Sequence, residues 1–259
     1  MFTPIRNVFF LLFLLLPVQR MAAEDIGITL TNFPDKTFRN YLLSQPFGED
    51  GELTDEEIEG ITELNLTNMG IKSLVGIAYF TNLYYLNCDS NQLSKLPINK
   101  NTQLKGLNCS FNQLTKLDIS QNTKLDWLCC NNNQLTTLDV SNNTNLKELI
   151  CGNNKLSNLD ISNNAQLYWL ECWSCQLTAL DISKNTALQY LDCYGNQLTS
   201  LDVSNNIVLE TLYFSNNKVT SLDLSHNTEL VRLSFYSNQL KELDISNNTK
   251  LSYLTCWMN

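Results

Sequence analysis

The chain has 259 residues and a net charge of −9, with 17 basic against 26 acidic side chains. This charge excludes a generally basic surface of the kind that binds nucleic acid. The single histidine, His226, leaves no histidine-based triad and no histidine-rich metal cluster to be built, so the composition argues against an enzyme. A chain of this length forms one or two domains.

Residues 1–23 are predicted to form a secretory signal peptide. Arg6 precedes an apolar run at residues 8–18 (VFFLLFLLLPV), and the first acidic residue is Glu24. The run is too short to cross a bilayer, because a membrane-spanning helix needs about 20 apolar residues. A buried core helix is the alternative, but the run has no polar face. We therefore expect cleavage near Ala23, a secreted or cell-surface protein, and no transmembrane span.

Residues 24–60 are predicted to form a small helical cap over the amino-terminal end of the repeats that follow. A first short helix after Pro34 would place four apolar side chains on one face, and the TxxE sequence at residues 54–57 is typical of a capping box that opens a second helix. The four apolar residues are Phe33, Phe38, Tyr41 and Leu42.

The sequence GEDGELTDEE inside this segment resembles a degenerate EF-hand calcium loop. Asp50 and Glu57 are the carboxylates at ligand positions, and Gly51 stands at the turn. Pro46 and Gly48 occupy the first two ligand positions, where oxygen donors are required. A structural cap is therefore favoured over calcium binding, and no other metal and no cofactor is predicted.

Residues 61–259 consist of tandem repeats. From Leu83 the pattern LxxLxCxxNxLxxLDxSxNTx recurs at a constant step of 21 residues as far as Leu251. One copy of 22 residues precedes eight copies of 21 and one partial copy. The core LxxLxLxxNxL is the leucine-rich-repeat signature. It predicts a β-rich solenoid with a parallel concave sheet and short extended or 3₁₀ arcs on the convex side.

Strand alternation assigns a direction to each side chain of a repeat. In the copy that begins at Leu83, Leu86 and Cys88 should point inward, whereas Tyr85, Asn87 and Asp89 should point outward. By the same rule Leu170 lies in the core and Thr211 on the open, solvent-facing side.

Seven of the nine cysteines share one inward register. Phe214 and Phe235 fill its two gaps, which indicates a requirement for a buried apolar group and not for a disulfide. We expect these thiols to be reduced and buried, and Cys129, outside the register, to be the reactive cysteine. Cys175 replaces an asparagine that otherwise recurs where the chain leaves the strand. The seven register positions are Cys88, Cys109, Cys130, Cys151, Cys172, Cys193 and Cys256.

A row of aspartates recurs on the return arcs, each followed two residues later by serine. Local turns, in which the carboxylate accepts bonds from the backbone and the hydroxyl, are the favoured interpretation. A row of divalent cations is the alternative, but DxS supplies few oxygens per ion. The aspartates are Asp118, Asp139, Asp160, Asp181, Asp202, Asp223 and Asp244.

The three outward columns of the ten predicted strands carry an excess of aromatic residues. Of thirty positions ten are Trp or Tyr, against 10% aromatic residues in the chain, which favours a recognition surface over a solvated sheet. The columns hold five acids and one base, so a basic or neutral partner is expected. The ten aromatic residues are Tyr85, Trp127, Trp169, Trp173, Tyr190, Tyr194, Tyr213, Tyr236, Tyr253 and Trp257.

The centre of this surface is predicted to be a two-by-two block of rings on neighbouring strands, with two carboxylates between them and further residues at its borders. Trp169, Trp173, Tyr190 and Tyr194 form the block, Glu171 and Asp192 lie within it, and Trp127, Tyr213, Arg232 and Tyr236 flank it.

A 21-residue leucine-rich repeat with Cys at its sixth position, followed by LDxSxNTxL, resembles the repeat of the internalin-J-like bacterial surface proteins. The first copy, IKSLVGIAYFTNL, also resembles the opening repeat of internalin-type domains. The resemblance implies a secreted or wall-attached, non-enzymatic protein that binds host or neighbouring-cell partners through its concave sheet. Neither an immunoglobulin-like segment nor an LPxTG-type motif follows the repeats, and the last copy stops within a strand. Either the chain is a fragment or its last copy is exposed.

Two functions remain open at this stage. The aromatic, acidic face could dock a protein on another cell or host surface, in adhesion or host interaction, or it could stack on the sugar rings of a glycan. The spread of the rings from Tyr85 to Trp257 favours the protein partner. We expect the chain to be a monomer.

Overall fold

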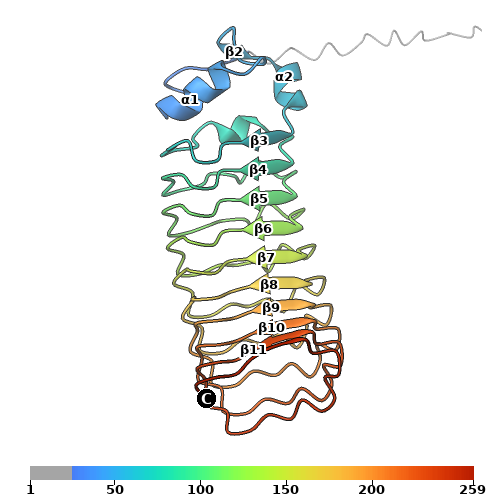
Figure 1. Ribbon diagram of the computed structural model, residues 1–259. Coiled ribbons are helices and arrows are strands. Elements are labelled where there is room, and N and C mark those ends of the chain that lie inside the picture. The colour runs from blue at the N-terminus through green and yellow to red at the C-terminus, as the bar shows by residue number, and fades with distance from the viewer. Residues whose placement is uncertain (1–24) are drawn as a thin grey trace, which may run out of the picture.

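The computed structural model describes residues 25–259, which form a small cap followed by a stack of coils (Figure 1). The predicted signal peptide, residues 1–23, lies outside the described residues. Within residues 25–259 no helix has the length and apolar character needed to cross a membrane.

The cap is built from two short helices and a two-stranded ribbon. β1 (Ile26–Gly27) pairs antiparallel with β2 (Glu52–Leu53), and α1 (Lys36–Leu43) and α2 (Asp55–Gly60) pack beside them. Phe38 and Leu42 of α1 are buried, and Phe33 is buried just before the helix begins. The capping box predicted at the start of α2 is confirmed.

Asp35 connects the cap to the first coil. One of its carboxylate oxygens accepts hydrogen bonds from the backbone N–H groups of Thr37 (2.9 Å) and Phe38 (3.0 Å) at the start of α1. The other accepts from the N–H groups of Lys72 (2.8 Å) and Ser73 (3.2 Å) in the first repeat. The same side chain therefore caps a helix and fixes that helix to the end of the stack.

The coils form one parallel sheet of ten strands in chain order. Each strand is three residues long, and equivalent positions pair, as in Leu86 with Leu107. The constant 21-residue step thus places every outward side chain beside its counterpart in the next repeat. The strands are β3 (Glu63–Asn65), β4 (Tyr85–Asn87), β5 (Gly106–Asn108), β6 (Trp127–Cys129), β7 (Glu148–Ile150), β8 (Trp169–Glu171), β9 (Tyr190–Asp192), β10 (Thr211–Tyr213), β11 (Arg232–Ser234) and β12 (Tyr253–Thr255).

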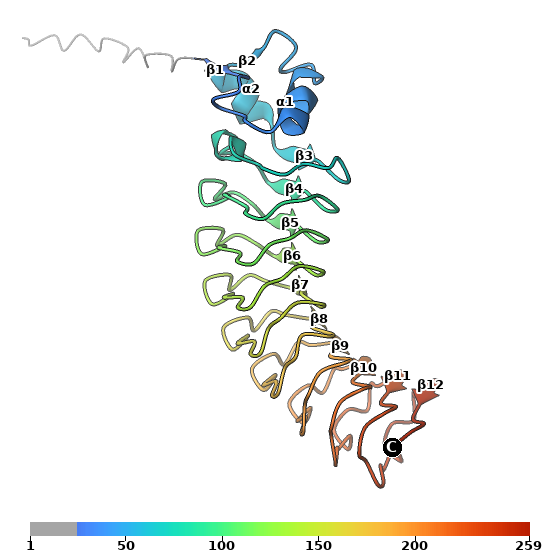
Figure 2. The same ribbon diagram turned by 90° about the vertical axis from the view of Figure 1, so that its left-hand side faces the viewer.

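The return arcs complete the core. Leu117 and Ile119 face inward as predicted. The arcs are extended and close through bonds of the 3₁₀ type, for example from Asn122 N to Ile119 O (3.0 Å), while a regular 3₁₀ helix, η1 (Ile77–Tyr79), lies in the first arc. Figure 2 shows that the stack bends, with the strands along the inner side of the bend. The fold is the β-rich solenoid with a parallel concave sheet that the repeats predict.

Two ladders of buried asparagines join successive coils. In the first, which the sequence indicated, the Asn133 amide donates to Cys130 O and, in the preceding coil, to Cys109 O (both 3.0 Å), while its carbonyl oxygen accepts from Leu114 N (3.0 Å). The side chain therefore joins the backbones of two coils and supplies the acceptor for the buried Leu114 N–H group.

The second asparagine ladder lies at the end of each arc, and sequence analysis did not single it out. Its eight members are at most 4% exposed. The Asn143 amide, as one example, donates to Asn122 O (2.9 Å) and to Ile119 O (3.2 Å) in the preceding coil. The signal was present in the sequence, because these residues recur with the same step of 21. They are Asn101, Asn122, Asn143, Asn164, Asn185, Asn206, Asn227 and Asn248.

The cysteine register is confirmed, with one correction inside it. All nine cysteines are free, and six of the seven ladder cysteines are fully buried. Burial raises the pKa of these thiols, for example that of Cys109. Cys256 is instead exposed, because its coil is covered on one side only.

The expectation that Cys129 is the reactive cysteine is wrong. Its side chain is only partly exposed, and burial raises the pKa of its thiol. Ser110 Oγ donates to the sulfur, and the sulfur donates to Asn131 Oδ1 (both 3.0 Å). The exposed Cys256 is the more accessible thiol.

Candidate binding surface

The open face is defined here as the outward side chains of β3–β12 together with the residue two positions beyond each strand. The alternation predicted for it is confirmed, since Tyr85, Asn87 and Asp89 are partly exposed while Leu86 and Cys88 are buried. All ten predicted Trp and Tyr residues are at least partly exposed on this face.

Glycines in the outward columns allow two of the ring arrangements. Tyr85 and Trp127, two strands apart, stack at 5.8 Å over Gly106, where an added Cβ would lie 2.6 Å from the Tyr85 ring. Trp173 covers Gly152, and the three atoms nearest to an added Cβ there are indole ring atoms at 2.4–2.6 Å. A side chain at either glycine would displace a ring.

The central rings make successive contacts along the sheet and do not form the predicted two-by-two block. Trp169 and Tyr190 stack face to face, with centroids 3.8 Å apart and planes at 1°. Trp173, however, turns back over the preceding strand at Gly152, and Tyr194 lies 6.3 Å from Tyr236, two coils further on.

The strip of rings continues from the Trp169–Tyr190 pair toward the carboxyl-terminal end of the sheet. Tyr190 meets Tyr213 edge to face at 5.9 Å, and Tyr236 stacks on Trp257 at 4.4 Å. The rings are therefore ordered by one another, which lowers the entropy lost when such side chains bind a partner.

Two carboxylates lie at the centre of the strip. Glu171 accepts a hydrogen bond from the indole N–H of Trp169 (2.9 Å) through one oxygen and from that of Trp173 (3.3 Å) through the other. Asp192 is paired with Glu171 in the sheet register, and its Oδ1 accepts from Tyr194 N (3.0 Å). Burial, with a smaller contribution from the charge of Glu171, raises the pKa of Asp192 to about 6.

Arg232 is exposed on the open face, as expected, but Thr211 is not. Thr211 points outward from β10, yet it is only 6% exposed. The register places it between Tyr190 and Arg232, and a short side chain between two long ones is shielded from solvent. The prediction that Thr211 is solvent-exposed is therefore wrong.

The calcium candidates in the cap already have local partners. Glu57 Oε2 accepts from the backbone N and the hydroxyl of Thr54 (both 2.9 Å), and Asp50 Oδ1 accepts from Glu52 N (3.1 Å). Residues 25–259 contain no cluster of three or more side chains suited to hold a metal ion. The geometry at these two residues is that of a helix cap and a turn.

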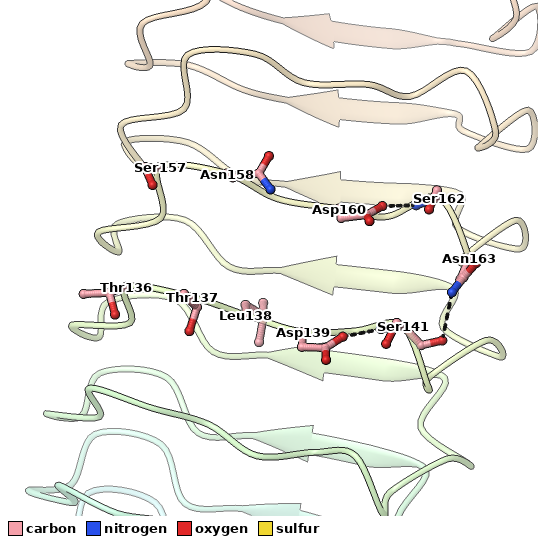
Figure 3. A pocket seen from close by; sticks show the side chains of 10 residues that line it. All are labelled: Thr136, Thr137, Leu138, Asp139, Ser141, Ser157, Asn158, Asp160, Ser162 and Asn163. Carbon is pink, nitrogen blue, oxygen red and sulfur yellow. Dashed lines mark hydrogen bonds between the residues drawn. The ribbon is translucent and has the colours of Figure 1, made fainter.

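The aspartate row forms the predicted turns. Asp139 Oδ1 accepts from Ser141 N (2.9 Å), and Asp160 Oδ1 accepts from Ser162 N (3.0 Å). These two turns line a polar groove between neighbouring arcs (Figure 3). Hydrogen bonds from serine lower the pKa of each aspartate in the row, so the carboxylates are stabilised locally.

The parallel sheet, the asparagine ladders and the buried cysteine register together define a cysteine-ladder leucine-rich-repeat solenoid. The structure is similar to the functional domain of InlJ from Listeria monocytogenes, which includes a cysteine ladder; the two are 37% identical with a TM-score of 0.86 over 91% of this chain and 52% of that chain. The chain thus spans about half the length of the InlJ domain. It is an internalin-like leucine-rich-repeat protein with a cysteine ladder.

Two further solved structures are more distant. The internalin InlF of Listeria monocytogenes is 27% identical, with a TM-score of 0.73 over 91% of this chain and 79% of that one. A leucine-rich-repeat protein of Leptospira interrogans is 27% identical, with a TM-score of 0.65 over 77% and 61%. No family model and no curated protein matches the chain. The similarities support a protein-interaction or adhesion role in general terms.

Proposed function

We propose that the chain is a secreted or cell-surface binding protein that recognises a protein partner through the open face. The observation that carries this proposal is the strip of mutually ordered rings on that face, with Trp169 stacked on Tyr190 at its centre. Ordered aromatic side chains are the usual anchors of recognition surfaces. The predicted binding residues, from Trp127 to Tyr236, are rings of this face or charged residues beside them.

The charges of the open face indicate the kind of protein that it binds. Glu63, Asp89, Glu148, Glu171 and Asp192 share the outward columns with one base, Arg232. Complementary potentials favour association and reject partners of like charge. A partner with a neutral or basic contact surface fits this face.

The stacking geometry favours a protein over a glycan. Trp169 and Tyr190 on neighbouring strands stack face to face, as do Tyr236 and Trp257, so each of these rings has one face covered by its neighbour. A sugar ring stacks on an open aromatic face, whereas a protein side chain can pack against edges and into the gaps between pairs.

The test compares two double variants of the chain without its leader. Trp169→Ala with Tyr190→Ala removes the central pair, and Asp160→Asn with Asp181→Asn alters the opposite arc while leaving an amide that can form the same turn. Each protein is applied to candidate host or neighbouring cells and to a glycan array, and its thermal midpoint is recorded.

We expect the first variant to lose cell binding, the second to bind like the parent, and both to keep midpoints close to that of the parent. The proposal fails if the first variant binds cells undiminished, or if the arc variant alone loses binding. Saturable binding of the parent to glycans that the first variant lacks would show a glycan-binding function instead.

A further inference from the structure

We infer that the centre of the open face is a receptor for an arginine side chain of the partner, held by Glu171 and Asp192 beside the indoles of Trp169 and Trp173. This inference rests on the proposed function and specifies the chemistry that the partner must present.

Glu171 is held in place before any partner arrives. One of its oxygens accepts from the indole N–H of Trp169 (2.9 Å), which lies in β8. The other accepts from the indole N–H of Trp173 (3.3 Å), which lies two positions beyond that strand. These bonds fix the orientation of the carboxylate and leave lone pairs free on both oxygens, because each carboxylate oxygen accepts more than one bond. The acceptor is therefore preorganised.

Asp192 lies next to Glu171 in the sheet. The register pairs the two residues, and neighbouring strands are about 4.8 Å apart. Tyr194 N donates to one oxygen of Asp192. The salt bridges found within residues 25–259, Lys147–Asp126 and Lys250–Glu229, do not involve either carboxylate. Two adjacent negative charges on a partly buried aromatic surface thus lack a cation.

The guanidinium group fits this site better than an ammonium group. It is planar, carries five N–H donors, and can donate to two neighbouring carboxylates at once. It is also weakly hydrated, so it loses less on leaving water for a surface of rings. Trp173 covers Gly152 with one face of its indole, and we expect a guanidinium bound to the carboxylates to stack on the other face.

The pKa of Asp192 adds a pH dependence to this arrangement. Burial and the charge of Glu171 raise this pKa to about 6. The other titratable groups whose charges couple to Asp192 are Tyr190, Tyr236, Cys172 and Cys193, and all of them are neutral at pH 7. The positive charge of Arg232, on β11, acts on the neighbouring Tyr190, where it opposes the rise in the pKa of that phenol. A guanidinium favours the ionised carboxylate, so its binding should weaken as the pH falls from 7.5 to 5, by up to roughly tenfold.

The experiment uses N-acetyl-arginine amide as the probe and its citrulline counterpart, a neutral analogue of similar shape, as the control ligand. Binding is followed by NMR through the indole N–H signals of Trp169 and Trp173, each assigned by a Trp→Phe variant. A single side chain binds weakly, so concentrations around the millimolar range are needed. The protein variants are Glu171→Gln, Asp192→Asn and the matched control Glu63→Gln, which removes an acid at the far end of the same face.

We expect the arginine probe to shift both indole signals saturably and the citrulline probe to leave them unchanged. Glu171→Gln and Asp192→Asn should weaken binding at least fivefold, and Glu63→Gln less than twofold. Equal shifts with citrulline, or an Asp192→Asn affinity equal to that of the parent, would overturn the inference. If that happens while the Trp169/Tyr190 double variant still loses cell binding, only the arginine assignment fails and the proposed function stands.

Discussion

Replacing Leu170 by Ala tests the packing of the solenoid at its middle. Leu170 is fully buried in β8, and the register places it between Leu149 and Leu191 on the neighbouring strands. Loss of three carbon atoms costs about 2.4 kcal/mol, at about 0.8 kcal/mol per buried CH₂. The strands on both sides prevent collapse into the space left, so a cavity contribution brings the expected loss to about 3–4 kcal/mol, within the ~2–5 kcal/mol range for such substitutions.

The measurement is urea unfolding followed by far-ultraviolet circular dichroism, with Arg232→Ala as the control. Arg232 is exposed, so its truncation should change the free energy of unfolding by less than about 0.5 kcal/mol. Thr211, although it points outward, is unsuitable as a control because it is buried. Comparable losses in the two variants, or a loss below about 1 kcal/mol for Leu170→Ala, would refute the inward and outward assignment.

Three further outcomes follow from the structure. Alkylation of the native protein should label Cys256 first and Cys129 more slowly, and the buried ladder thiols should react only after unfolding. Intact-mass analysis checks this order. Early labelling of the ladder cysteines would contradict it. Asn164→Ala should cost about 1–3 kcal/mol in urea unfolding, because it removes two buried hydrogen bonds to Val140 O and Asn143 O, whereas the exposed Asn163→Ala should cost well under 1 kcal/mol. Asp192→Asn should stabilise the protein at pH 7.5. The pKa of this carboxyl rises from 3.8 unfolded to about 6 folded, so the parent loses stability as the pH rises through that interval and the variant does not. Thermal midpoints at pH 4 and pH 7.5 should therefore differ between the two proteins only at the higher pH, and an equal difference at both would exclude this cause.

The architecture could be predicted from the sequence because a single period controls it. The constant step of 21 sets the strand register, and alternation within Leu83–Asn91 decides which side chains are buried. The turns at Asp139 and Asp160 followed from local hydrogen-bonding chemistry alone. Features that are determined by the repeat pattern alone could therefore be predicted from the sequence.

The arrangement of the rings was not accessible, because it depends on what the neighbouring strands carry at the same position. Gly152 lets Trp173 turn back over the preceding strand, away from Tyr194. Thr211 is shielded because Tyr190 and Arg232 on both sides are longer. Column-by-column comparison of side-chain size could have indicated both effects. The position of a residue in its strand predicts the direction of its side chain. It does not predict which neighbouring side chains that residue contacts.

The central claim, that the open face is the recognition surface, can be tested most directly by hydroxyl-radical footprinting of the chain free and bound to partner cells. All four tryptophans lie on the open face, whereas Ile207, Val208 and His226 are exposed on the arcs. The claim predicts that binding protects Trp169 and Trp173 from oxidation while the three arc residues react as in the free protein. Protection of the arc residues with unchanged oxidation of the tryptophans would contradict it.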